Sequence, residues 1–294
     1  MMRTAWIFPG QGSQKVGMAV DLTNLPTAGE KFSEAAALLG WSVLAVCQGE
    51  AGDLAQTRYT QPCLYVVEAI LADALLARDH QPELVAGHSL GEYSALYAAG
   101  VFDFVTGLQL VKQRAELMAG AAGGKMAALI GCDREQLQAA LTATAEVVLA
   151  NDNSDAQVVI SGTPAGVDAV LAQVQAKRAV PLAVSGAFHS PLMAAAAGEF
   201  QTALDAVPFR EARWPVLSNT DPIPEQSGAA LKRVLSRQMT GSVRWRETMA
   251  QFASAGLEQV LEIGPGQVLT GLCKRGCPQL QRLNVSNAAA VTAL

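Results

Sequence analysis

The sequence predicts an α/β protein, with a mostly parallel sheet in a large domain and a smaller domain inserted into it. Towards both ends of the chain, short apolar runs that meet glycine turns alternate with helical stretches, which is typical of a doubly wound parallel sheet. In between, the order changes to strand, helix, strand, strand, helix, strand, which is a split βαβ unit. With 294 residues, 50% of them hydrophobic, the chain is long enough for both cores.

In the large domain, the expected strands are short apolar runs that lead into turns, at 4–8, 83–87, 216–218 and 257–263. The expected helices are 61–78, a helix after Gly91 that runs through Ala99, 103–120, 191 to about 207, and 268–275. Pro62 is expected in the first turn of its helix, and Ser190 is expected to cap the helix that Pro191 opens. Because strands and helices alternate, the strands should lie parallel.

The small domain follows the glycine-rich stretch 120–124, which is the best candidate hinge in the chain. Its expected strands are 126–130, 147–150, 157–161 and 179–184, and its expected helices are 134–142 and 165–176. This order defines a ferredoxin-like unit that ends at Ser185-Gly186. We therefore expect a large catalytic domain of residues 1–122 and 187–294, with the ferredoxin-like domain at 123–186.

Composition and charge exclude several classes of protein. The formal charge of −5 argues against nucleic acid as the main partner. The longest apolar stretch, 63–77, is interrupted by Glu68 and Asp73, so no segment is expected to cross a membrane, and the N-terminus has no signal-peptide pattern. The five cysteines are scattered and form no Cys-x-x-Cys pair. They argue against a metal site or a disulfide framework, and for a reducing, cytoplasmic location.

The loop after the first strand, Pro9-Gly10-Gln11-Gly12-Ser13, is glycine-rich but fits neither of two nucleotide-binding patterns. The dinucleotide pattern needs a third glycine where Lys15 stands. The phosphate-binding loop needs Lys followed by Ser or Thr where Met18-Ala19 stands. The turn must therefore serve something other than a nucleotide phosphate.

Gly87-His88-Ser89-Leu90-Gly91 has the Gly-x-Ser-x-Gly pattern, and it lies between an expected strand and an expected helix. A nucleophilic serine has to stand clear of the sheet on a tight turn, and the glycines let the strand and helix approach closely. The first turn of the helix then offers free N–H groups and a positive dipole end to a developing oxyanion. We therefore expect Ser89 to be a nucleophile rather than an incidental serine.

The chain has three histidines from which a base for Ser89 can come. His80 lies in a polar connection that is expected to be solvated. His88 adjoins the nucleophile at a tight turn, where neighbouring side chains point apart, so packing behind the site is its expected role. His189 directly precedes a helix, just past the small domain. By elimination His189 is the best candidate base, and a structural loop histidine is the alternative.

Arg114 is unusual because its neighbours three and four residues away on the expected helix are all apolar. They are Leu110, Val111, Leu117 and Met118. An arginine within an apolar stripe is costly unless it meets an anion or reaches water. A substrate carboxylate would supply that anion with bidentate geometry, and an internal ion pair with Asp or Glu would supply it equally well. Helix spacing alone leaves these alternatives open.

Several motifs recur in the same order in one known family. They are Phe8-Pro9-Gly10-Gln11-Gly12-Ser13-Gln14, Gln61-Pro62, 87–95, Gln113-Arg114, 157–162 and Gly264-Pro265-Gly266. On these motifs, which span nearly the whole chain, the sequence resembles the bacterial-type malonyl-CoA:acyl carrier protein transacylases of dissociated fatty acid synthesis. The resemblance implies an α/β-hydrolase-like large domain with a ferredoxin-like insert, which agrees with the pattern of elements.

The resemblance implies Ser89 as nucleophile, His189 as base and Arg114 as the ligand of the malonyl carboxylate. The backbone N–H of Leu90 and Gln11 would form the oxyanion hole. Gln238 matches the position whose main-chain carbonyl orients the histidine.

Further residues are expected to border the bound substrate: His88, Met118, Asn151 and Asn153. Asn151 and Asn153 match positions that line the cleft from the small domain. Asp152 departs from the family pattern, in which a hydrophobic residue is frequent, and leaves the detail of that wall open.

The implied reaction moves a malonyl group from coenzyme A to the phosphopantetheine thiol of an acyl carrier protein through a malonyl-Ser89 ester, with no cofactor. The acidic carrier protein needs a basic patch, for which Lys274 with Arg275, or Lys177 with Arg178, are candidates. Three alternatives stay open: a serine esterase or thioesterase, a catalytically idle malonyl-thioester binder, and a transacylase of another malonyl pathway such as polyketide or malonate metabolism.

Overall fold

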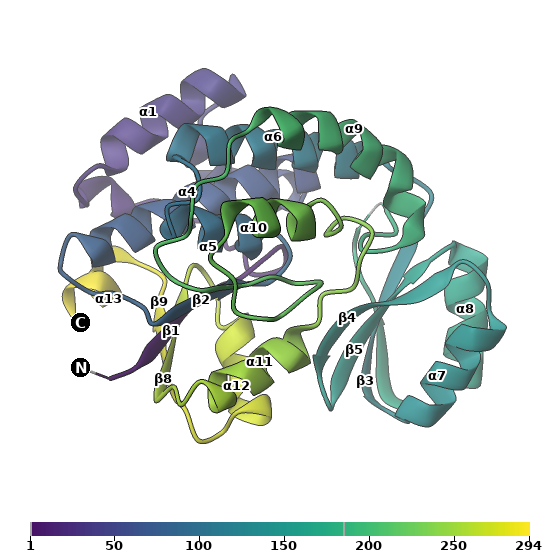
Figure 1. Cartoon of the computed structure of the whole chain (residues 1–294). Coiled ribbons are helices and arrows are strands. Elements are labelled where there is room, and N and C mark those ends of the chain that lie inside the picture. The colour runs from purple at the N-terminus through teal and green to yellow at the C-terminus, as the bar shows by residue number, and fades with distance from the viewer. Residues whose placement is uncertain (1, 185) are drawn as a thin grey trace.

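The computed structural model describes residues 2–184 and 186–294, and its strands form two separate sheets (Figure 1). A five-stranded sheet lies at the centre of the large domain. A four-stranded sheet with two helices on one side, residues 125–181, forms the small domain beside it (Figure 1). The α/β fold predicted from the sequence is confirmed.

The large sheet contains five parallel strands in the order β7-β2-β1-β8-β9. They are β1 (Thr4–Phe8), β2 (Leu84–Gly87), β7 (Val216–Leu217), β8 (Gln259–Ile263) and β9 (Gln281–Val285). The first four match strands predicted from the sequence, and their parallel arrangement is confirmed. The edge strand β9 has no counterpart in that prediction, because its residues are mostly half-exposed and do not form an apolar run.

Alternate residues of β1 contribute to the cores on the two faces of the large sheet. Trp6 and Phe8 are buried on one face, and Ala5 and Ile7 on the other, as the two-residue repeat of a strand requires. The first core includes α4 (Thr57–Leu76), α5 (Gly91–Ala98) and α6 (Phe104–Gly120). The second includes α11 (Trp245–Ser254) and α12 (Val268–Gly276). Helices therefore cover both faces, which is the doubly wound arrangement.

Further helices complete the large domain. They are η1 (Asp21–Asn24), α1 (Ala28–Leu39), α2 (Val43–Gln48), α3 (Ala51–Leu54), η2 (Pro191–Met193), α9 (Ala194–Ala206), α10 (Gly228–Leu235) and α13 (Ala288–Thr292). The cap predicted at Ser190 is present, since its hydroxyl accepts from the N–H of Leu192. One boundary is wrong: α4 starts at Thr57, so Pro62 lies inside the helix rather than in its first turn. The helix begins here because the carbonyl oxygen of Gln56 accepts the backbone N–H groups of Tyr59 and Thr60.

The small domain has the predicted ferredoxin-like order, with an antiparallel sheet β4-β5-β3-β6. Its elements are β3 (Lys125–Cys132), α7 (Arg134–Ala143), β4 (Val147–Ser154), β5 (Gln157–Gly162), α8 (Pro164–Gln173) and β6 (Ala176–Pro181). The helix predicted at 165–176 is too long, because the backbone is already extended at Val174. The predicted domain end at Ser185-Gly186 includes Ser185, which lies outside the described residues, and the domain bounds stay a prediction.

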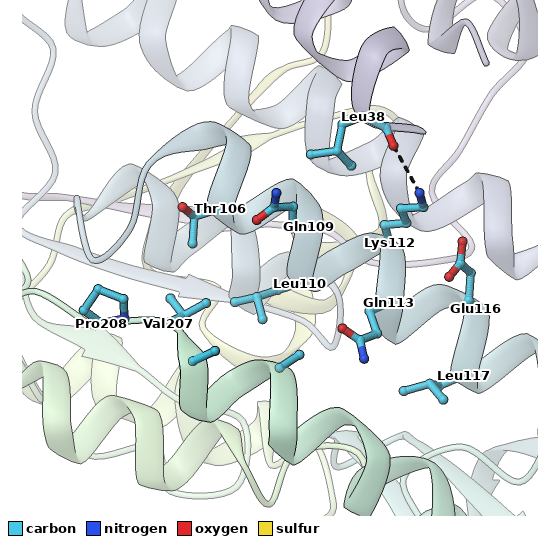
Figure 2. A pocket seen from close by; sticks show the side chains of 12 residues that line it. Leu38, Thr106, Gln109, Leu110, Lys112, Gln113, Glu116, Leu117, Val207 and Pro208 are labelled. Carbon is cyan, nitrogen blue, oxygen red and sulfur yellow. Dashed lines mark hydrogen bonds between the residues drawn. The ribbon is translucent and has the colours of Figure 1, made fainter. Parts of the chain in front are cut away.

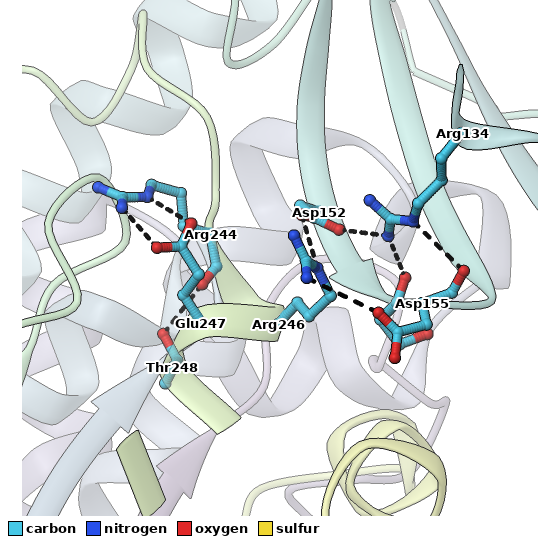
Figure 3. A network of polar contacts seen from close by, with 8 residues as sticks. Arg134, Asp152, Asp155, Arg244, Arg246, Glu247 and Thr248 are labelled. Atoms are coloured by element: carbon cyan, nitrogen blue, oxygen red, sulfur yellow. Dashed lines mark hydrogen bonds and ion pairs between the residues drawn. The ribbon is translucent and has the colours of Figure 1, made fainter. Parts of the chain in front are cut away.

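Strand β4 joins the small domain to the segment that precedes α11. Val243 donates its N–H to Ala150 at 2.8 Å and accepts the N–H of Asp152 at 2.9 Å. The carboxylate of Asp152 binds Arg134 at 2.7 Å within the small domain and Arg246 of α11 at 2.9 Å (Figure 3). The polar residue that departs from the family pattern therefore links the two domains.

Candidate active site

Ser89 lies on the tight turn between β2 and α5, in a left-handed backbone conformation with a φ of 53°. Packing requires the two glycines of the turn. A Cβ on Gly91 would lie 2.0 Å from the carbonyl oxygen of Phe8, and a Cβ on Gly87 would lie 1.9 Å from Gly91. The strand, turn and helix that the Gly-x-Ser-x-Gly pattern predicts are present, and they hold Ser89 at the carboxyl end of the sheet.

The hydroxyl of Ser89 lies 2.7 Å from Nε2 of His189. The other ring nitrogen, Nδ1, lies 3.0 Å from the main-chain carbonyl oxygen of Gln238. Because a carbonyl oxygen only accepts, Nδ1 carries the proton and Nε2 is able to accept the proton of Ser89. Burial, and after it the positive charge of Arg114, lower the pKa of His189 to about 3. The imidazole is therefore neutral, and able to act as a base, at neutral pH.

Arg114 on α6 is fully buried, and its guanidinium reaches the hydroxyl of Ser89. Its Nη2 donates to Ser89 Oγ at 3.2 Å and to Gln238 Oε1 at 3.0 Å, and its Nη1 donates to Gln61 Oε1 at 2.7 Å. All three acceptors are neutral oxygens. Among the described residues, no carboxylate lies within ion-pair distance of Arg114. The alternative of an internal ion pair in direct contact is therefore wrong: the nearby carboxylate of Glu92 is separated from Arg114 by the amide of Gln238, and the guanidinium has no carboxylate bound to it.

The side chain of Gln238 connects several parts of the site. In addition to accepting from Arg114, it donates from Nε2 to the carbonyl oxygen of Ser89 at 2.9 Å and to Glu92 Oε2 at 2.8 Å. Its main-chain carbonyl meanwhile faces His189. Gln238 is buried, so water does not compete for these bonds. A single residue thus fixes Ser89, His189 and Arg114 relative to one another.

These residues surround a cavity of about 90 Å³. The predicted site residues that line it are Gln11, His88, Ser89, Leu90, Arg114, Met118, Asn151 and His189. Gln61, Met126, Leu182, Val184 and Phe188 complete the wall. Because the cavity is small and combines apolar side chains with one cation, it suits a short acyl group that carries a negative charge.

Two predicted residues make contacts that the sequence did not indicate. The side-chain amide of Gln11 donates to Thr57 Oγ1 at 3.1 Å, which leaves the backbone N–H of Gln11 as its candidate oxyanion donor. Asn153 does not line the cavity, but its Oδ1 lies 2.8 Å from Nε2 of His88. His88 also packs against the ring of Trp245, at 5.6 Å between ring centroids. Asn153 therefore borders the site through His88.

A larger groove of about 950 Å³ lies between α6, α9 and the end of α1 (Figure 2). Leu110, Lys112 and Leu117 of α6 line one side of it, and Val207 lines the other. None of the predicted site residues is among its lining residues. Gln113, which stands beside Arg114 in one of the quoted motifs, lies in this groove rather than in the catalytic cavity.

Within residues 2–184 and 186–294, no three His, Cys, Asp or Glu side chains are grouped so that they could hold a metal ion. In the same part of the chain, no helix combines the length and the apolar character needed to span a membrane. Both candidate basic pairs, Lys274 with Arg275 and Lys177 with Arg178, are exposed.

Residues 5–294 match the family model described as an acyl transferase domain. The chain belongs to the acyl transferase family. This acyl transferase is 63% identical to the malonyl CoA-acyl carrier protein transacylase of Synechocystis sp. over 284 residues, which cover 97% of each chain. The crystal structure of a Synechocystis malonyl-CoA:ACP transacylase matches with a TM-score of 0.98 at 61% identity, over 100% of both chains.

A solved complex of a type II polyketide acyl carrier protein with its malonyl-transacylase is also similar to this acyl transferase. It matches with a TM-score of 0.93 at 41% identity, over 99% of this chain and 98% of that chain.

Gln61 and Asn219 are among the site residues to which the sequence assigned no role. Gln61, which belongs to a motif of the resemblance, holds the guanidinium of Arg114. Asn219 contacts the backbone of the Ser89 turn. The one signal for Asn219 is its place just after the predicted strand 216–218, because functional groups of parallel sheets gather where the strands end.

Proposed function

We propose that this acyl transferase moves a malonyl group from coenzyme A to the phosphopantetheine thiol of an acyl carrier protein, through a malonyl ester of Ser89. The names of the similar proteins support the substrates. The observation that carries the proposal is Arg114, a buried cation with only neutral partners that donates to the nucleophile at 3.2 Å. A malonyl group brings the missing counter-ion to that position, and an acetyl group does not.

In the proposed first half-reaction, Ser89 Oγ attacks the thioester carbonyl carbon while His189 Nε2 takes the hydroxyl proton. The backbone N–H groups of Leu90 and Gln11 hold the oxyanion of the tetrahedral intermediate. The carbon–sulfur bond then breaks, and the thiolate of coenzyme A leaves with the proton from His189. In the second half, His189 takes the proton of the carrier thiol while its sulfur attacks the ester carbonyl carbon. The carbon–oxygen bond to Ser89 then breaks, and Ser89 Oγ leaves with the proton from His189.

The proposed carboxylate contact also affects the base. The positive charge of Arg114 contributes to the low pKa of His189, second to burial. A malonyl carboxylate that pairs with Arg114 cancels that charge, so the pKa of His189 rises when malonyl-CoA binds. The base therefore becomes stronger when the correct substrate is in place.

Two alternatives are weaker on specific observations. A serine esterase has no need for an unpaired arginine in its acyl cavity, and an idle binder has no need for a serine within 2.7 Å of a neutral histidine. The choice of pathway rests on the relatives. We propose fatty acid biosynthesis, and the similarity to a polyketide transacylase makes polyketide synthesis the second candidate.

The remaining assignments are proposals of the same kind. His88, Met118, Asn151 and Asn153 border the substrate, and Gln238 orients His189 through its carbonyl. Residues 1–122 and 187–294 form the catalytic domain, and 123–186 form the ferredoxin-like domain. No cofactor is required, because serine, imidazole and backbone amides supply the nucleophile, the base and the oxyanion donors. The scattered cysteines favour a cytoplasmic location.

Intact mass spectrometry tests the proposal directly. Mixed with malonyl-CoA, the protein should gain one malonyl group, and the adduct should persist in buffer until a carrier protein with a free phosphopantetheine thiol is added. Ser89→Ala should gain none, because it lacks the attacking oxygen. An adduct that decays equally fast without the carrier would identify a hydrolase, and a malonyl adduct on Ser89→Ala would contradict the nucleophile.

A further inference from the structure

We propose that Asn219 is a positioning residue that holds the Ser89 turn in its reactive shape. Asn219 follows the end of β7, which pairs in parallel with β2, so Val216 lies beside Val85 and Leu217 beside Ala86. The carboxyl ends of these two strands therefore lie next to each other, although Asn219 and Ser89 are 130 residues apart in the sequence. The inference rests on the proposed function of Ser89 as the nucleophile.

Asn219 binds the backbone on both sides of His88, the residue just before the nucleophile. Its Oδ1 accepts the N–H of Ser89 at 2.7 Å, and its Nδ2 donates to the carbonyl oxygen of Gly87 at 2.6 Å. The residue is 2% exposed, so water does not replace these bonds easily. An amide is suited to this position because it offers an acceptor and a donor side by side. A carboxylate would place a second oxygen against the carbonyl of Gly87, and an alanine would leave both groups unpaired.

The backbone conformation of the turn explains why the two hydrogen bonds from the Asn219 side chain, which together form a brace, are needed. Ser89 has a φ of 53°, which lies in a region that residues other than glycine rarely adopt. Such a conformation persists only when the surrounding structure enforces it. Asn219 fixes the N–H of Ser89, and Gln238 donates to the carbonyl oxygen of Ser89 at 2.9 Å. Both peptide groups that flank the serine are thus held by buried side chains.

The brace also gives the backbone N–H groups of Ser89 and Leu90 different roles. The N–H of Ser89 is occupied by Asn219. The N–H of Leu90, by contrast, donates to no group of the described residues. Since an oxyanion donor must be free before the reaction, Asn219 leaves the N–H of Leu90 for that task. Rotation of the turn would move both this donor and the hydroxyl of Ser89.

Asn219 is itself anchored to the helix that follows the turn. Its backbone N–H donates to Oε2 of Glu92 at 3.2 Å, and the same oxygen accepts from Nε2 of Gln238 at 2.8 Å. Glu92 is buried in the first turn of α5, two residues after Leu90 in the sequence. The brace is therefore tied to the same helix that carries the oxyanion donor, and the turn and helix are held as one unit.

The test is the rate at which malonyl-Ser89 forms in the Asn219→Ala variant. At saturating malonyl-CoA the rate should fall about 10²-fold, as expected for a nucleophile displaced by a fraction of an ångström to an ångström. The KM for malonyl-CoA should stay nearly unchanged, because Asn219 is not among the residues that line the cavity. Asn219→Asp, which keeps the shape but loses the donor, should show a loss of the same order.

Asn284→Ala is the matched control. Asn284 on β9 donates to the carbonyl oxygens of Glu262 at 3.2 Å and Gly264 at 3.3 Å, so it braces the end of β8 in a similar way, at a turn without a nucleophile. This variant should keep the wild-type rate per folded molecule, with the folded fraction measured by thermal unfolding.

The outcomes separate the inference from the proposed function. If the wild type forms no malonyl ester, the function is wrong. If the wild type reacts and a folded Asn219→Ala or Asn219→Asp variant reacts equally fast, Asn219 only supports the fold and the inference is wrong. If Asn219→Ala does not fold, the rate of Asn219→Asp decides.

Discussion

Two charge clusters of this protein, one in the cavity beside Ser89 and one between the domains, differ in how their charges are compensated. In the cavity, Arg114 is fully buried and donates only to neutral oxygens. Between the domains, Asp152 has an arginine on each carboxylate oxygen, Arg134 at 2.7 Å and Arg246 at 2.9 Å (Figure 3). In the cluster between the domains, the outer cluster, the carboxylate of Asp152 is already paired within the protein. In the cluster at Arg114, the inner cluster, the guanidinium has no paired carboxylate until an anion binds.

The difference teaches how to separate charges that stabilise a fold from charges that recognise a substrate. A buried cation without a paired carboxylate lowers stability, so the proposed anionic substrate would explain why Arg114 is retained beside Ser89. The ion pairs of Asp152 need no ligand, and the partly exposed side chains of Arg134 and Arg246 reach water. Substitutions should therefore change substrate choice at the inner cluster and stability at the outer one.

The largest expected effect follows from Arg114→Ala. Transfer from malonyl-CoA should lose about 30-fold to several thousand-fold in kcat/KM, because a carboxylate left unpaired in the cavity costs about 2–5 kcal/mol. Transfer from acetyl-CoA should stay equal or improve, since the unpaired cation is gone. Arg114→Lys should recover only part of the malonyl activity, because an ammonium cannot reproduce the planar fork. The measurement is kcat/KM for both thioesters.

Lys112→Ala provides the control on the same helix. Lys112 donates to the carbonyl oxygen of Leu38 and lines the groove between α6 and α9, outside the catalytic cavity. Its removal should leave the ratio of malonyl to acetyl activity at the wild-type value. Equal fractional losses of both activities in Arg114→Ala would show that Arg114 maintains the fold rather than reading the substrate.

A smaller effect is expected in the pH profile of the acylation rate. The pKa of His189 is lowered to about 3, by burial first and by Arg114 second, so kcat/KM of the wild type should not fall near the ordinary histidine value of about 6.5. In Arg114→Ala one repelling charge is removed, and the protonated imidazole becomes less unfavourable. The pKa of His189 then rises, and the acid limb of the profile moves to higher pH.

The same shift has a consequence for stability, with the sign fixed by linkage. The pKa of His189 is lower in the folded than in the unfolded protein, so the unfolded state binds the proton first as pH falls below about 6.5. The free energy of unfolding should decrease between about pH 6.5 and pH 3, and His189→Gln should lessen this decrease. Denaturant unfolding at several pH values measures it, and an unchanged slope in His189→Gln would contradict the assignment.

The smallest effect is expected at the cluster between the domains. The side chain of Arg246 is 44% exposed, so Arg246→Ala should lower the free energy of unfolding by less than about 1 kcal/mol, and less at high salt. The preference for malonyl over acetyl should not change. Urea unfolding at two salt concentrations, together with kcat/KM for both thioesters, checks this; a changed acyl preference would place Arg246 in the substrate site.

The parts of the site that the sequence predicts are those encoded locally. The Ser89 turn needs two glycines at fixed spacing between a strand and a helix, and all of these are visible within a few residues. Burial of Arg114 follows from its helical neighbours, but its partners do not. Gln61 and Gln238 come from distant segments, so the choice between a substrate anion and an internal ion pair needed the fold.

The parts of the fold that the sequence left without prediction are also explained by their context. The α1–α3 region and helices α10 and α11 received no assignment from the sequence. Helices α2, α3 and α10 have only 6, 4 and 8 residues, which is too short for a helical repeat of apolar residues to stand out. Asn219 was missed because the strand before it, β7, has only two residues and its contact with Ser89 is long-range. Gln11 was assigned to the oxyanion hole as a whole residue, and its side chain is bound to Thr57.

The position of β1 in the middle of the large sheet has a consequence during synthesis of the chain. β1 and β2 are made first, but the other neighbour of β1 is β8, which starts at Gln259. Ser89 is therefore translated long before His189 and Gln238. We expect a nascent or truncated chain that ends before Gln238 to carry the serine without its oriented base, so that incomplete products consume no acyl-CoA while the protein is still being made.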